Sequence, residues 1–205
     1  MQDLAIGNWA RESHLSSEHL DSMRDLNRRF LDLADAWAGP LDRGGRAAAL
    51  GRQVAPLTSV QRAAAASCPY ALFDLRFTDD AYWRARLAEA GHLRVADEPC
   101  VDEATVDFVR LALFYTWHVA SSTAFAAHLL LGMHGTTTAA FRRMTLDNLP
   151  ALVATEAMNL TARWSDCAVY WTALLDAAAR ADPKALRRVQ LSGLQLAAAA
   201  HLPVI

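Results

Sequence analysis

Glu156 is the residue whose place in the sequence most needs a chemical explanation. It lies between Val153 and Leu160 in a run of apolar residues that recur at three- and four-residue steps, so the spacing predicts a buried side chain. A buried carboxylate is costly unless it is paired or protonated. Glu156 could therefore contact a ligand or transfer a proton in a helix-lined pocket, or form a structural pair with an arginine or a histidine. The structural pair is favoured, because ion pairs commonly occupy such positions.

Tyr115, His118 and Ser122 form a second candidate group. Their three- and four-residue spacing places them on one face of a helix. If His118 faced Glu156 from a neighbouring helix, the two side chains could make an acid–base pair. A core histidine with a hydroxyl partner accounts for the same pattern and is favoured. The candidate ligand-binding residues are thus Glu156, His118, Tyr115 and Ser122, and no catalytic residue is assigned.

The sequence predicts no cofactor and no metal site. It contains no glycine-rich nucleotide loop, no His-Glu-x-x-His and no Gly-x-Ser-x-Gly. Glu89 and His92 spell one Glu-x-x-His, but di-iron bundles need two copies within helices and Gly91 interrupts this one. The cysteines (Cys68, Cys100, Cys167) are three and widely spaced, which favours reduced thiols in a cytoplasmic protein.

The element expected to position the second group is a long central helix from about 102 to 134. Asp102 can cap it, and Gly135 suits the left-handed position after its end. Its apolar residues lie on nearly all sides, which predicts a helix buried by other helices or in a membrane. The stretch between Arg110 and His128 includes His118, Ser121, Ser122 and Thr123 and is at or below the length of a span. We therefore expect no membrane span.

Glu156 is expected on a second long helix, which begins near Thr145 and ends near Ala181. Pro150 is tolerated in its first turn. The apolar seam of this helix suits packing beside the central helix.

Several local signals predict the remaining elements. An amphipathic stripe predicts a helix from about Ser17 to Trp37, and Thr58 with Gln61 makes a capping box. Phe73–Phe77 alternates with period two, as an extended segment does, and could pair with His92–Val95. Asp182 and Pro183 begin the last helix.

Composition places the chain among globular proteins. It has 205 residues, of which 53% are hydrophobic and 20% are charged. Alanine is abundant and arginine far outnumbers lysine, with Lys184 the only lysine; both features favour helix and also fit a GC-rich bacterial genome. We predict one all-α domain over residues 1–205, with six to eight helices around the central helix. Residues 1–14 are expected to be a lead-in that can be flexible, and they contain no secretory signal.

Three hypotheses for function follow. The first is a cytoplasmic, non-catalytic helical protein of the regulatory or adaptor type, which acts through protein–protein contacts and forms a homodimer. The second is a small-molecule binder or enzyme with a helix-lined pocket around Glu156, His118 and Tyr115. The third is a helix-turn-helix regulator that uses Arg46 to Arg62. The net charge of −2 makes a nucleic-acid partner the least favoured.

Overall fold

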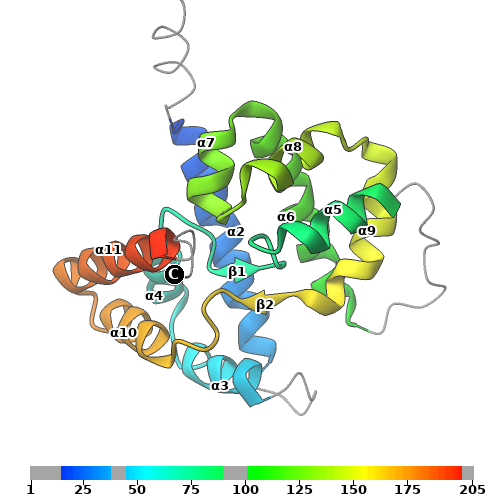
Figure 1. Ribbon diagram of the computed structural model, residues 1–205. Helices are drawn as coiled ribbons and strands as arrows, with labels where there is room; N and C mark the ends of the chain where they lie inside the picture. The colour runs from blue at the N-terminus through cyan, green and yellow to red at the C-terminus, as the bar shows by residue number, and fades with distance from the viewer. Residues whose placement is uncertain (1–14, 38–44, 90–100, 200–205) are drawn as a thin grey trace, which may run out of the picture. The chain divides into compact units, whose positions relative to one another are not determined.

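The computed structural model describes residues 15–37, 45–89 and 101–199. Ten α-helices and two very short strands lie in these residues, so the all-α prediction is confirmed, with more helices than the six to eight expected (Figure 1). The chain divides into two compact units: Met1–Ser22 with Leu75–Leu160, and Met23–Asp74 with Thr161–Ile205. The lead-in 1–14 lies outside the described residues, and the single domain stays a prediction.

The described α-helices are three to 20 residues long, and the elements follow one another along the chain. In order they are α2 (Ser17–Ala36), α3 (Gly45–Val54), α4 (Ser59–Ala65), β1 (Phe73–Asp74), α5 (Asp80–Glu89), α6 (Glu103–Ser122), α7 (Ala124–Ala126), the π-helix η1 (Ala127–Leu131), α8 (Gly135–Arg143), η2 (Leu146–Asn148), α9 (Leu149–Glu156), η3 (Ala157–Asn159), β2 (Thr161–Ala162), α10 (Ala168–Ala179) and α11 (Pro183–Ala199).

The first unit is built around α6, which packs against α8 and α9, while α5 packs against α8 (Figure 1). Its aromatic centre is Trp83, which is fully buried. The Trp83 ring stacks on Phe77 and lies 4.8 Å from the ring of Phe141. Its indole nitrogen donates to the carbonyl of Leu75 at 3.0 Å, so the ring is buried without an unsatisfied donor.

The second unit is centred on α10, which packs against α11, α4 and α3. Phe30 of α2 is fully buried here, with its ring 5.5 Å from Trp37 and 6.5 Å from Trp171. β1 and β2 form an antiparallel pair in which Phe73 lies opposite Ala162. The extended segment predicted at Phe73 is therefore present, but its partner is β2; His92–Val95 lies outside the described residues.

Three predicted helix N-caps are confirmed by the structure. Asp102 accepts from the backbone N–H of Thr105 at 2.8 Å and begins α6. Thr58 and Gln61 form the reciprocal capping box of α4. Asp182 accepts from the N–H groups that open α11, at 2.9 and 3.1 Å. These bonds span two or three residues, which explains why the local sequence was sufficient to predict them.

The predicted helix over 102–134 is not continuous: it is interrupted at Thr123, and the chain forms α7 and η1 beyond that point. α6 ends at Ser122, because Thr123 is extended, with φ −154° and ψ 129°. The hydroxyl of Ser122 donates to the carbonyl of His118, a local bond that competes with helix continuation. The left-handed glycine is Gly132, with φ 76°, whereas Gly135 begins α8.

The predicted helix from Thr145 to Ala181 is also wrong, since its residues form two helices. α9 ends at Glu156, and the chain then passes through η3 and β2 before α10 begins at Ala168. Trp164 has φ 52° in this connection, a left-handed conformation that cannot continue a right-handed helix. Pro150 does lie in the first turn of α9, as expected, and α9 packs against α6.

Candidate functional site

Glu156 is fully buried at the end of α9, and the side chains of Tyr82, Asn159 and Arg86 donate to its carboxylate, with the Thr155 hydroxyl a further donor at 3.4 Å. The hydroxyl of Tyr82 lies 2.7 Å from both carboxylate oxygens. Asn159 donates to Oε2 at 2.8 Å, and the guanidinium of Arg86 reaches Oε1 at 3.2 Å. This arrangement satisfies the carboxylate with an opposite charge and neutral donors, which offsets the cost of its burial.

Tyr82 connects the members of this cluster. Its hydroxyl donates to Glu156 and accepts from Arg86 at 3.2 Å and Asn159 at 2.8 Å, so both its donor and acceptor capacities are used. Burial and the neighbouring Glu156 carboxylate raise the pKa of Tyr82. The phenol therefore stays protonated and acts as a hydrogen-bond donor. The guanidinium of Arg76 lies 4.0 Å over the same ring.

Tyr82, Arg86 and Asn159 were not predicted as the partners of Glu156. Two signals were available. Tyr82 and Arg86 are four residues apart, so they share a face of α5, and Asn159 follows Glu156 by three residues. Neither signal indicates which helix packs against that face of α5. Only the packing of the first unit shows this.

The other predicted residues have different neighbours. The hydroxyl of Tyr115 donates to the backbone carbonyl of His19 at 2.8 Å, and Ser122 donates to the carbonyl of His118. The ring of His118 lies 5.9 Å from the ring of His19. All three residues lie on α6, but Tyr115 is buried whereas His118 and Ser122 are exposed. The core histidine favoured from the sequence is therefore not found. Among the described residues, no hydrogen bond or ring contact joins any of them to Glu156.

His19 is a buried polar residue in the first turn of α2. Its side chain is buried, and its Nδ1 has no hydrogen-bond partner within the described part of the chain. Burial and the neighbouring His118 lower the pKa of His19, although Glu18 opposes this shift. The imidazole therefore stays neutral where it packs beside α6.

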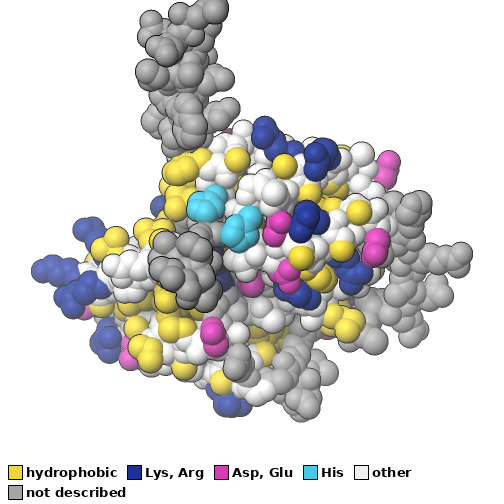
Figure 2. Space-filling model, viewed as in Figure 1, with side chains coloured by type: hydrophobic (Ala, Val, Ile, Leu, Met, Phe, Trp, Pro, Cys, Tyr) yellow, Lys and Arg dark blue, Asp and Glu magenta, His cyan; other side chains and the backbone are white. Residues whose placement is uncertain are grey.

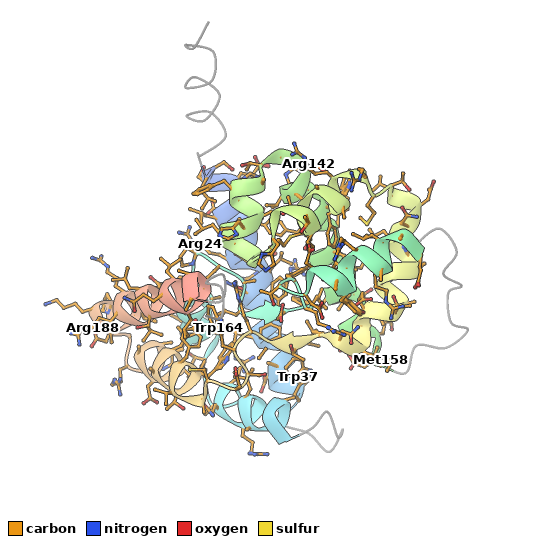
Figure 3. All side chains as sticks on the ribbon, viewed as in Figure 1. Arg24, Trp37, Arg142, Met158, Trp164 and Arg188 are labelled. Atoms are coloured by element: carbon orange, nitrogen blue, oxygen red, sulfur yellow. The ribbon has the colours of Figure 1, made fainter. Side chains whose placement is uncertain are left out.

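The second unit contains a buried polar cluster around Tyr70. The hydroxyls of Tyr70 and Tyr170 lie 3.1 Å apart, and Tyr70 donates to the carbonyl of Gln190 at 3.2 Å. Trp164, labelled in Figure 3, meets both tyrosine rings edge-on. Burial raises the pKa of the Cys68 thiol to about 11. The thiol is therefore protonated at neutral pH and is a poor nucleophile.

A further buried polar residue, Asn27, organises the chain between α4 and β1. Its amide nitrogen donates to the carbonyls of Ala66, Cys68 and Tyr70, at 3.3, 3.3 and 2.8 Å. Its oxygen accepts from the N–H of Leu72 at 2.8 Å. In the sequence, Asn27 is a polar residue within the apolar stripe of α2. A polar residue at such a position indicates a buried polar role.

The segment considered as a DNA reader forms α3 and α4. Arg62 of α4 is engaged within the protein: its guanidinium lies 3.2 Å from Asp32 and 2.8 Å from Asp35. On the face drawn in Figure 2, both basic and acidic side chains are present. These features do not favour binding to a phosphate backbone.

α6 is not covered on all sides, contrary to the expectation of a fully buried central helix. Leu111 and Phe114 are 44% and 48% exposed, and His118 is also exposed. The ring of Phe114 lies 5.9 Å from that of Trp117, which is half-buried. The outward row of α6, defined as Asp107, Leu111, Phe114 and His118, therefore presents apolar and aromatic side chains to solvent.

Comparison with protein-family models, curated proteins and solved structures gave no match for this chain. Within residues 15–37, 45–89 and 101–199, no three His, Cys, Asp or Glu side chains converge in a way that could hold a metal ion. No helix in those ranges combines the length and apolarity that crossing a bilayer requires.

Proposed function

We propose that this chain is a non-catalytic cytoplasmic protein of the regulatory or adaptor type, which acts through protein–protein contacts and forms a homodimer. The observation that carries the proposal is the outward row of α6, where Leu111 and Phe114 are nearly half exposed in the middle of a 20-residue helix. Exposed aromatic and aliphatic side chains that lie together on a regular element are typical of an interface.

The alternative of a small-molecule pocket around Glu156, His118 and Tyr115 has less support. Tyr82, Arg86 and Asn159 donate to the Glu156 carboxylate. These bonds account for the burial of the carboxylate without a ligand. A catalytic carboxylate is usually poised by its surroundings for proton transfer, whereas this one is bound by several donors at once.

The helix-turn-helix alternative has the least support. α4 has seven residues, and Arg62 forms ion pairs with Asp32 and Asp35. A recognition helix needs basic and polar side chains that are free to meet phosphates and base edges.

Native mass spectrometry of the gently purified chain, followed by denaturation, tests the proposal. We expect a species of twice the 22.4 kDa monomer mass with no additional component. An excess mass that is lost on denaturation would indicate a captured ligand and would favour the pocket alternative. A monomer at every concentration would contradict the homodimer.

A further inference from the structure

We infer that two copies of this chain associate through their α6 helices in an antiparallel pair about a twofold axis between Leu111 and Phe114. This inference rests on the proposed function and specifies the partner as a second copy and the surface as the outward row of α6. It follows from the spacing of the row, from its exposure and from the charges at its ends.

The spacing of the outward row is the same from either end. Asp107, Leu111, Phe114 and His118 are separated by four, three and four residues. On an α-helix these steps keep the four side chains in one narrow row. When two such helices run antiparallel about the centre of the row, Leu111 of each copy lies opposite Phe114 of the other. Asp107 of each copy then lies opposite His118 of the other.

The side chains that meet in this arrangement are chemically complementary. Leu111 and Phe114 are 44% and 48% exposed in the single chain, so their pairing removes apolar surface from water. An aspartate carboxylate accepts from an imidazole N–H in either charge state of the histidine. A parallel pair would instead place Asp107 against Asp107 and His118 against His118. Like groups would then face each other, which disfavours that orientation.

The neighbouring groups are compatible with the same arrangement. Arg110 pairs with Asp107 on the same helix, and both side chains are more than half exposed. The positive charge of Arg110 therefore remains beside the Asp107 carboxylate, which His118 of the other copy would contact. At the next turn outward, Ser121 and Ser122 would lie opposite Ala104 and Glu103 of the other copy, all of them exposed. A twofold pair needs such a self-complementary surface, because each contact occurs twice.

The test is the dimer dissociation constant, measured by analytical ultracentrifugation. Phe114→Ala is expected to raise the constant at least roughly 30-fold, as loss of a central aromatic anchor does. Val169→Ala is the matched control, because Val169 is 80% exposed on α10 and lies outside the row. This control should leave the constant unchanged. Both substitutions remove exposed side-chain atoms, so neither should prevent folding.

A charge exchange tests the antiparallel register. His118→Glu should weaken the dimer about tenfold, because it sets two acidic side chains against each other. Asp107→Lys should weaken it less, and the double variant should return the constant close to that of the wild type. Rescue in the double variant supports the antiparallel pair, since the two residues are eleven positions apart on one helix.

The outcomes separate this inference from the proposed function. A wild-type dimer that is insensitive to Phe114→Ala, or a double variant without rescue, would overturn the α6 pair while leaving the homodimer in place. A wild-type chain that is monomeric throughout would overturn both.

Discussion

Tyr82 and Glu156 make the shortest link between α5 and α9, with the phenol donating to the buried carboxylate over 2.7 Å. The same phenol accepts from Arg86 and Asn159, which also donate to the carboxylate. Four side chains thus satisfy one another at a position where an unpaired carboxylate would be strongly destabilising. We therefore expect Glu156 to have a structural role, which leads to the first prediction.

Replacing Glu156 by Gln should lower stability without affecting association. The glutamine amide would place N–H donors among groups that already donate, so the free energy of unfolding should fall by roughly 1–3 kcal/mol. Urea denaturation measures this change. The dimer dissociation constant should stay at the wild-type value, because Glu156 is fully buried and is not part of the outward row. Equal stability combined with lost activity in any assay would indicate a ligand-binding role instead.

Asn27→Leu should be strongly destabilising, although leucine suits the apolar stripe of α2. The substitution removes the donor to three carbonyls and the acceptor for the Leu72 N–H. Each buried polar group left without a partner costs roughly 1–3 kcal/mol. Leu26→Met, at a neighbouring buried position, is a suitable control, since a volume-conserving exchange usually costs less than about 1.5 kcal/mol. Thermal unfolding of both variants distinguishes a polar organising role from simple packing.

Gly193→Ala should destabilise α11 despite the higher helix propensity of alanine. A Cβ atom at Gly193 would lie 1.9 Å from the hydroxyl oxygen of Tyr70, whose ring is fully buried. Overpacking of this kind costs about 1–3 kcal/mol, more than the propensity gain. Gly135→Ala is the control, because nothing lies within 4 Å of a Cβ there. A control that destabilises as much as Gly193→Ala would contradict this explanation.

Stability should decrease as the pH falls below about 6.5, the ordinary pKa of histidine. The pKa of His19 is lowered in the folded protein by burial and by His118, so the unfolded chain binds protons more readily than the folded one. The loss begins at the unfolded pKa and levels off below the folded pKa. His19→Gln should remove this dependence. The lowered pKa values of Asp79 and Asp80 act separately, at more acidic pH.

Urea midpoints recorded between pH 5 and 8 test this prediction, because the aspartates stay ionised over that range. His128→Gln is the matched control, since the ring of His128 bonds to the carbonyl of Met133 and lies outside the His19–His118 contact. The control should keep the wild-type pH profile. An identical profile in His19→Gln and in the wild type would contradict the assignment.

The local features of this chain could be predicted from the sequence. Asp102, Asp182 and the Thr58–Gln61 box begin helices in the structure, because a cap depends on residues within one turn. The helical class follows from apolar spacing for the same reason. The position of Glu156 could also be predicted as buried, since burial is a property of its place in a three- and four-residue repeat.

The tertiary structure decided which groups meet. The apolar sequence of α6 does not indicate which of its faces other helices cover. The exposure of Leu111 and Phe114 could therefore not be predicted. The partner of Glu156 depends on how α5 and α9 pack, a long-range relationship that spacing within one helix does not encode. The breaks at Thr123 and Trp164 arise from the conformations of single residues, which a continuous apolar pattern conceals.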